Sequence, residues 1–140
     1  RAGSTDIVEF HGNVQTLSCL DCGRSRSSFE ADLDARPPLC ECGGVLRPDV
    51  VFFGEAIPTA ALARSQQAAE DCAVMLVVGT SAVVQPAASI PVIARQSGAF
   101  VVEVNPGPTP LTDVVSNVLL EGPSGVMLPR LLDACLAIDS

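Results

Sequence analysis

The chain has 140 residues, of which 48% are hydrophobic, and it carries a formal net charge of -8 at neutral pH. This length accommodates one globular domain with a small module attached. The eight basic residues are arginines scattered along the chain, which speaks against a nucleic-acid-binding surface. These residues show no signal peptide and no membrane-spanning run, so we expect a cytoplasmic protein without a nucleic-acid or membrane partner.

Two closely spaced cysteine pairs stand in the first third of the chain. Cys19 and Cys22 enclose two residues, Cys40 and Cys42 enclose one, and 17 residues separate the pairs. Two such turns can supply four thiolates to one tetrahedral zinc ion. Disulfides or free thiols are the alternatives, and disulfides need an oxidising compartment. Because a four-thiolate zinc has no open coordination position, we expect one zinc ion with a structural role.

The segment between the two pairs is mainly polar, and Phe29 and Leu33 are among its few apolar residues. It could not bury a core alone, so metal binding would supply much of the folding free energy of this module. The remaining cysteines, Cys72 and Cys135, lie in apolar surroundings typical of helices, and we expect both to pack in the core.

The second half of the chain alternates between helical and strand patterns. The predicted elements are a helix at 60–72, a strand at 73–79, a helix at 86–98, strands at 99–105 and 117–121, and a helix at 126–138. Thr59 would cap the first helix, Gly98 would stop the second, and Pro129 falls near the first turn of the last. The strand at 73–79 is continuously apolar, as expected for a parallel strand covered on both faces. This order predicts a parallel α/β sheet with right-handed crossovers.

Polar loops follow two of these strands. Their residues are Gly79, Thr80 and Ser81 after the first strand, and Asn105, Pro106 and Gly107 after the second. Ligands of parallel sheets bind beyond the carboxyl ends of the strands, and these side chains suit phosphate or ribose. Loops of α/β proteins without a cofactor carry the same residue types, so the loops alone leave a cofactor open.

Five segments share one order and spacing with a known family. They are IVEFHG at 7–12, the cysteine pairs, LRPDVVFFGE at 46–55, GTSAVVQPA at 79–87 and VNPGPTPL at 104–111. Together they resemble the sirtuins, the NAD-dependent protein deacylases, and most of all the bacterial and archaeal members. The resemblance implies an α/β fold made of the C-terminal half of a Rossmann-like parallel sheet and a small four-cysteine zinc-ribbon module. It divides the chain into a catalytic-histidine segment (1–12), a zinc-binding module (13–48) and an NAD-binding half with a substrate-binding loop (49–140).

Sirtuins also have a glycine-rich phosphate loop and a Gln-Asn-Ile-Asp strand end, which lie before the segment that residues 1–4 resemble. The resemblance therefore implies that the chain is the C-terminal part of a catalytic domain, and that the missing N-terminal half is a partner without which we expect it to be inactive. Half of a parallel sheet would expose a long hydrophobic edge.

The resemblance also assigns roles to single residues. His11 would be the general base that accepts a proton from a ribose hydroxyl of NAD, and a structural histidine is the alternative. The reaction would be lysine deacylation, in which the acyl group passes to ADP-ribose and nicotinamide is released. The expected NAD-binding residues are Gly79, Thr80, Ser81, Asn105, Pro106, Gly107 and Ser124.

An acyl-lysine peptide would add a strand between residues 50–55 and residues 82–85. The expected substrate-binding residues are Val51, Phe53, Gly54, Glu55, Val83 and Val84. A plain buried strand would also explain the apolar run at 50–53.

Two other classes of function remain open for this sequence. A zinc-ribbon interaction module without chemistry would account for the cysteines, but not for the polar strand ends. An NAD-dependent mono-ADP-ribosyltransferase would use the same cofactor and transfer ADP-ribose to a protein side chain.

Overall fold

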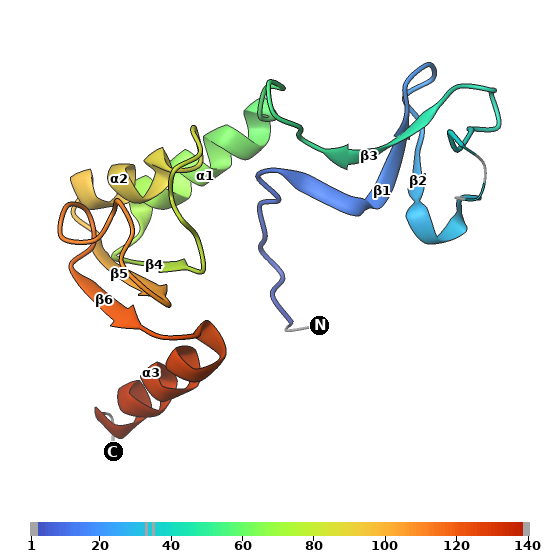
Figure 1. Ribbon diagram of the computed structural model, residues 1–140. Coiled ribbons are helices and arrows are strands. Elements are labelled where there is room, and N and C mark those ends of the chain that lie inside the picture. The colour runs from blue at the N-terminus through green and yellow to red at the C-terminus, as the bar shows by residue number, and fades with distance from the viewer. Residues whose placement is uncertain (1–2, 33, 35, 139–140) are drawn as a thin grey trace. The chain divides into compact units, whose positions relative to one another are not determined.

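The computed structural model describes residues 3–32, 34 and 36–138. Arg1 and Ala2 at the start of the predicted histidine segment, and the apolar Leu33, lie outside the described residues. The chain divides into two compact units, Arg1–Leu62 and Ala63–Ser140, and each is described by itself (Figure 1). Within the described ranges, every helix is too short or too polar to cross a membrane.

The first unit is built on a three-stranded antiparallel sheet in the order β2-β1-β3. Its elements are β1 (Gly12–Cys19), β2 (Ser25–Ser27), the short 3-10 helix η1 (Ser28–Glu30) and β3 (Leu46–Val50). The core is small among the described residues of this unit, where Leu17, Cys19 and Leu46 form the buried cluster. Phe29 does not contribute, since its side chain is 83% exposed. The two cysteine pairs lie at the end of this sheet where β1 ends and β3 begins.

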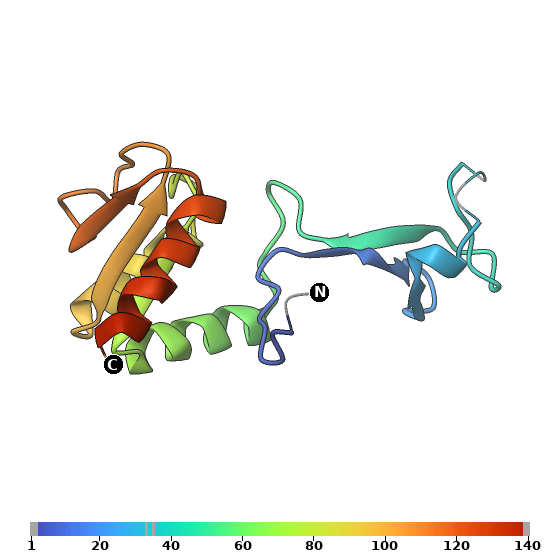
Figure 2. The same ribbon diagram turned by 90° about the horizontal axis from the view of Figure 1, so that it is seen from below.

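The second unit contains a three-stranded parallel sheet in the order β4-β5-β6. Its elements, together with the helix that leads into it, are α1 (Thr59–Asp71), β4 (Val74–Val78), α2 (Ser89–Gln96), β5 (Phe100–Asn105), β6 (Val118–Glu121) and α3 (Ser124–Ile138). The predicted order of helices and strands is therefore confirmed. Figures 1 and 2 together show α2 and α3 on opposite faces of the sheet.

The helix boundaries follow from their terminal hydrogen bonds. Gly98 adopts φ +99° just beyond α2, as expected for a stop signal. The helix predicted from residue 126 begins at Ser124 instead, because the N–H groups of Val126 and Met127 both donate to the carbonyl of Pro123. Pro129 consequently lies inside α3, beyond its first turn.

One buried cluster of the second unit lies on the face of the sheet that α2 covers. Val77, Val101, Leu111 and Val115 form its buried cluster, and Val92 of α2 packs against them. A second cluster of alanines joins α1, α2 and the start of β5, and Cys72 packs there as predicted. The prediction was wrong for Cys135, which is exposed on α3.

The prediction that β4 is covered on both faces is also wrong for this chain. Val74, Leu76 and Val78 alternate with the half-buried Met75 and the buried Val77, and they are 58%, 48% and 38% exposed. Their face of the sheet is the one on which α3 contacts β5. Within the described residues β4 pairs only with β5, so one edge of the sheet is also open.

Candidate functional site

The four paired cysteines converge on one point. Their sulfur atoms all lie within 4.8 Å of one another, with Cys19 and Cys42 Sγ 3.5 Å apart and Cys22 and Cys40 Sγ 3.8 Å apart. A tetrahedron with metal–sulfur bonds of about 2.3 Å has sulfur atoms about 3.8 Å apart. None of the four forms a disulfide with another cysteine, so the disulfide alternative is not realised. The donor set fits one zinc ion.

The backbone around the cluster favours thiolates. The N–H of Cys22 points at Cys19 Sγ, 3.5 Å away, and lowers the pKa of that thiol to about 6. At Cys42 the hydrogen bond from the N–H of Gly44 lowers the pKa. The neighbouring sulfurs of Cys22 and Cys19 raise it by more, so the pKa of this thiol is about 12. A divalent metal between Cys19 and Cys42 would offset the repulsion between their thiolates.

Gly44 makes this close approach possible. A Cβ at this position would lie 2.7 Å from Cys19 Sγ and 2.7 Å from a carboxylate oxygen of Asp21. Any other residue would push the second cysteine turn away from the first. The shortened spacing between Cys40 and Cys42 is accommodated by two backbone bonds, from Cys40 N–H to the Gly44 carbonyl and from Gly43 N–H to the Cys40 carbonyl.

The predicted catalytic histidine lies directly before β1. His11 is exposed, and its ring meets that of Phe10 edge to face with centroids 5.2 Å apart. The carbonyl of His11 accepts a hydrogen bond of 3.0 Å from the N–H of Val51. Gly12 is required beside it, because its φ is +70° and a Cβ would lie 1.8 Å from the carbonyl oxygen of Asp49. The histidine segment is thereby joined by its backbone to the start of the predicted substrate segment.

The substrate segment itself is a loop, since β3 ends at Val50. Val51 is half-buried, whereas Phe52 is 54% and Phe53 94% exposed. The alternative explanation of this apolar run as a buried strand is therefore wrong beyond Val50. Exposed aromatic rings next to a histidine are instead available to a ligand.

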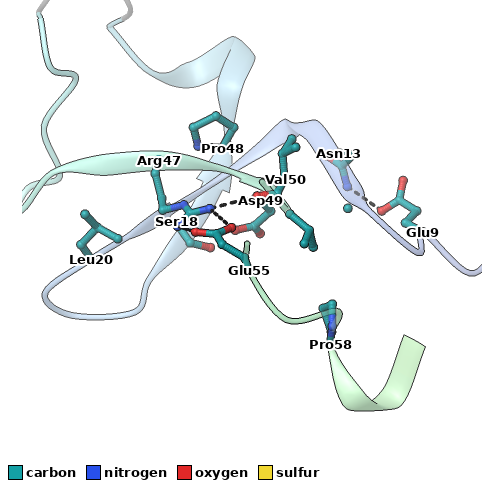
Figure 3. A pocket seen from close by; sticks show the side chains of 12 residues that line it. Glu9, Asn13, Ser18, Leu20, Arg47, Pro48, Asp49, Val50, Glu55 and Pro58 are labelled. Atoms are coloured by element: carbon teal, nitrogen blue, oxygen red, sulfur yellow. Dashed lines mark hydrogen bonds and ion pairs between the residues drawn. The ribbon is translucent and has the colours of Figure 1, made fainter. Parts of the chain in front are cut away.

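A pocket of about 440 Å³ lies behind this loop, between β1 and β3 (Figure 3). It is lined by Glu9, Gly12, Asn13, Ser18, Leu20, Arg47, Pro48, Asp49, Val50, Val51, Glu55 and Pro58. Glu55 faces this pocket with its carboxylate held by Arg47, which the sequence predictions did not include. The sequence offered one clue to this pair, because Arg47 and Glu55 lie eight residues apart in the same motif at 46–55 and enclose a loop.

The predicted cofactor residues gather at the carboxyl ends of the strands of the second unit. Asn105 Nδ2 donates to the carbonyl of Thr80 at 3.1 Å, and the N–H of Gly79 donates to the carbonyl of Val104 at 3.0 Å. The N–H of Gly122 donates to the carbonyl of Asn105, which brings the start of α3 and the half-buried Ser124 to the same edge. Ser81, Pro106 and Gly107 follow in the same two loops. The carboxyl ends of these strands thus carry hydroxyl, amide and backbone N–H groups suited to a nucleotide.

The second predicted peptide-binding segment also belongs to the second unit. Val83 and Val84 are 62% and 42% exposed in an irregular loop, while Ala82 before them packs against the core. The N–H of Ala82 donates to Thr80 Oγ1 at 3.1 Å, so this loop is tied to the predicted cofactor loop.

Comparison with known proteins identifies one family. The family model described as Sir2 family matches residues 1–86. A protein of Aquifex aeolicus named NAD-dependent protein deacylase is 48% identical over 115 residues, which cover 81% of this chain and 48% of that protein. A protein of Mycobacterium leprae with the same name is 42% identical over 143 residues, covering 99% of this chain and 60% of that protein. The chain spans roughly half the length of the curated relatives it matches.

Solved structures agree with these relatives. A structure described as a Sir2 homolog–NAD complex superposes with a TM-score of 0.92 at 39% identity, covering 100% of this chain and 55% of that chain. A structure described as Sir2 bound to acetylated peptide superposes with a TM-score of 0.90 at 33% identity, covering 96% of this chain and 58% of that chain.

Proposed function

The chain belongs to the Sir2 family, and from this we propose that it forms the carboxyl-terminal part of the catalytic domain of an NAD-dependent protein lysine deacylase. The acyl group of an acyl-lysine side chain would pass to ADP-ribose with release of nicotinamide and consumption of one water molecule, and the free lysine would remain on the peptide. The relatives named as deacylases and the solved complexes with NAD and with acetylated peptide support this reaction class.

One observation carries the proposal. The backbone of His11 is hydrogen-bonded to Val51, so the base and the apolar loop that would receive the acyl-lysine form one continuous surface of the first unit. A structural histidine would be buried and paired, but His11 is exposed. Its imidazole is suited to accept a proton near neutral pH.

NAD, when bound, supplies the ADP-ribosyl group whose bond to nicotinamide is broken. We assign its binding to Gly79, Thr80, Ser81, Asn105, Pro106, Gly107 and Ser124. The side-chain amide of Asn105 donates to the carbonyl of Thr80, which holds the two loops assigned to NAD together. His11 would hold the proton of a ribose hydroxyl of bound NAD, so that this oxygen could attack the acyl carbon.

We assign peptide binding to the two loops that contain Val51, Phe53, Gly54, Glu55, Val83 and Val84, with the main chain of the peptide added as a strand. Val51 and Phe53 would exclude water from the acyl-lysine side chain. The zinc at Cys19, Cys22, Cys40 and Cys42 stabilises the first unit and takes no part in the reaction, because four thiolates leave no open position.

The activity also needs a complementary part. The open edge of β4 and the exposed Val74, Leu76 and Val78 are suited to further strands and a covering helix. We propose that the amino-terminal half of the catalytic domain pairs there, and we call the two parts together the completed domain.

The test supplies the completed domain with radiolabelled NAD and an acetyl-lysine peptide. Deacylation gives free O-acyl-ADP-ribose, an ADP-ribosyltransferase leaves the label on protein, and a zinc-ribbon module binds no NAD. We expect the first result. His11→Ala should lower turnover about 10²-fold or more without changing the zinc content. Unchanged turnover in this variant would contradict the assignment of the base.

Gln67→Ala is the matched control for a surface substitution. The exposed side chain of Gln67 donates to Asp71 within α1, and neither residue is among those assigned to a ligand, so we expect full activity.

A further inference from the structure

Arg47 and Glu55 close a ring around the loop that follows β3. The guanidinium and the carboxylate pair through two bonds, Nη1 to Oε1 at 2.8 Å and Nη2 to Oε2 at 2.9 Å. This two-point geometry is stronger and more directional than a single ion contact. The side chains are only 34% and 40% exposed, so solvent screens the pair less than it would screen fully exposed charges.

The same two side chains also take up polar backbone groups of the loop. Arg47 Nη2 donates to the carbonyl of Val50 at 2.9 Å, and Glu55 Oε2 accepts a hydrogen bond from the N–H of Phe52 at 3.0 Å. The N–H of Glu55 in turn donates to the carbonyl of Phe52 at 3.0 Å. The ion pair therefore fixes the backbone between residues 50 and 55 from both ends (Figure 3).

Hydrophobic packing cannot fix this loop. Phe53 is almost fully exposed and Phe52 is half-exposed, and the latter ring meets Arg47, whose Cζ lies 5.2 Å from the ring centroid. A cation over an aromatic face adds a weak attraction. The polar ring formed by Arg47 and Glu55 is thus the main restraint that holds two aromatic side chains at the surface.

Both carboxylate oxygens of Glu55 are already engaged. Oε1 accepts from Arg47, and Oε2 accepts from Arg47 and from the N–H of Phe52. The hydrogen bonds from Arg47 hold the pKa of Glu55 at about 2, so the carboxyl is ionised at neutral pH. The loop and Arg47 therefore take up three of the roughly four acceptor positions of the carboxylate.

We propose that Arg47 and Glu55 are positioning residues, which hold residues 51–54 in the conformation that receives the acyl-lysine peptide, and that Glu55 acts through the loop rather than by touching the peptide. This rests on the proposed function for the identity of the ligand. It makes the ion pair a determinant of peptide affinity that is separate from NAD binding.

The first measurement is structural and needs no enzyme activity. Amide hydrogen exchange of the zinc-loaded chain reports protection at Phe52 and Glu55. We expect Arg47→Ala and Glu55→Ala to abolish that protection equally, while the amides of β1 and β3 that pair across the sheet stay protected. Retained protection at Phe52 in Arg47→Ala would overturn the proposal.

The second measurement is a double-mutant cycle on peptide binding. In the completed domain, the Kd of an acetyl-lysine peptide, measured by fluorescence anisotropy, should rise on the order of tenfold in each single variant, as expected when a binding loop is misplaced. The double variant should bind no more weakly than either single variant, because residues that act as one unit are not additive. The Kd of NAD should stay within about twofold. Additive losses, or a loss in Glu55→Ala alone, would mean that Glu55 contacts the peptide and would overturn the proposal.

Conservative variants distinguish the effect of the two-point contact from the effect of the charges alone, and they are less disruptive to folding than alanine substitutions. Arg47→Lys keeps the charge but cannot form the two-point contact, and Glu55→Gln keeps an acceptor for Phe52; both should show intermediate peptide Kd values. Gln67→Ala is the control and should match the wild type in both measurements. A wild type that binds the peptide without turnover would count against the proposed function only, whereas lost loop protection with unchanged peptide affinity would count against this inference only.

Discussion

Glu103 is the one buried charged residue among those described, and it organises the loop that follows β5. Its side chain is 1% exposed and accepts hydrogen bonds from the hydroxyls of Thr109, Thr112 and Ser116. Thr109 Oγ1 also accepts a hydrogen bond from the N–H of Leu111, a core residue. The carboxylate of Glu103 thus ties residues 109–116 to the core face of β5. Glu103 lies two residues before Asn105, which we assign to NAD binding.

Replacement of Glu103 should therefore destabilise the second unit. Glu103→Ala removes the acceptor shared by three hydroxyls and leaves a cavity, so we expect the free energy of unfolding to fall by about 2–4 kcal/mol. Urea denaturation followed by circular dichroism would measure it. Glu70→Ala on the exposed side of α1 is the control and should change it by less than about 0.5 kcal/mol. Equal midpoints for the two variants would contradict the role of Glu103.

For single residues, the sequence predicted those whose chemistry is visible in a local motif. It missed residues whose role depends on hydrogen bonds to side chains farther along the chain. The cysteines were found because metal spacing is local. Glu103 lies in an apolar strand run, and only its fold-dependent contacts with residues up to 13 positions later show why a charge is tolerated there. Arg47 was missed for the same reason, because its partner Glu55 is separated from it by a loop whose conformation the sequence does not specify.

Among the elements, the strands of the first unit depend most on the metal. The buried cluster of this unit contains Leu17, Leu46 and the metal ligand Cys19 itself. So small a core cannot offset the conformational entropy of the unit. This also explains why β1 and β2 were not predicted: their sequence alternates weakly, and the cross-link that orders them lies at their ends.

Loss of one ligand should therefore unfold the first unit alone. We expect Cys42→Ser to lose the single bound zinc ion per chain and the amide protection of β1 and β3, because binding free energy is folding free energy in such modules. The second unit, with its own buried clusters, should keep its protection. Metal analysis and hydrogen exchange measure the two effects.

Cys135→Ser is the matched control, because Cys135 is an equally exposed thiol outside the cluster. It should retain zinc and protection throughout. Zinc retained by Cys42→Ser, with β1 still protected, would show that three thiolates suffice.

For the whole molecule, the sequence predicted the family and the parallel half-sheet, because the succession of motifs and the alternation of elements extend over the chain. It did not predict how the faces of β4 are divided. A continuous apolar run is equally apolar on both sides, and only the structure shows that α2 covers one side while Val74, Leu76 and Val78 remain exposed on the other.

This exposed face predicts the behaviour of the isolated chain. Three apolar side chains beside an open strand edge favour pairing with a second copy, so we expect concentration-dependent self-association in sedimentation velocity. Leu76→Lys places a charge at the centre of the face and should weaken the association by about tenfold or more, since each copy loses the burial of one leucine. Val114→Lys is the control, because Val114 is 79% exposed on a loop of the same unit and should leave association unchanged.

The same face is the proposed binding site of the complementary half. Leu76→Lys should therefore also weaken assembly of the completed domain from its two parts. A wild-type chain that stays monomeric would contradict the first expectation, and assembly that is insensitive to Leu76→Lys would contradict the second.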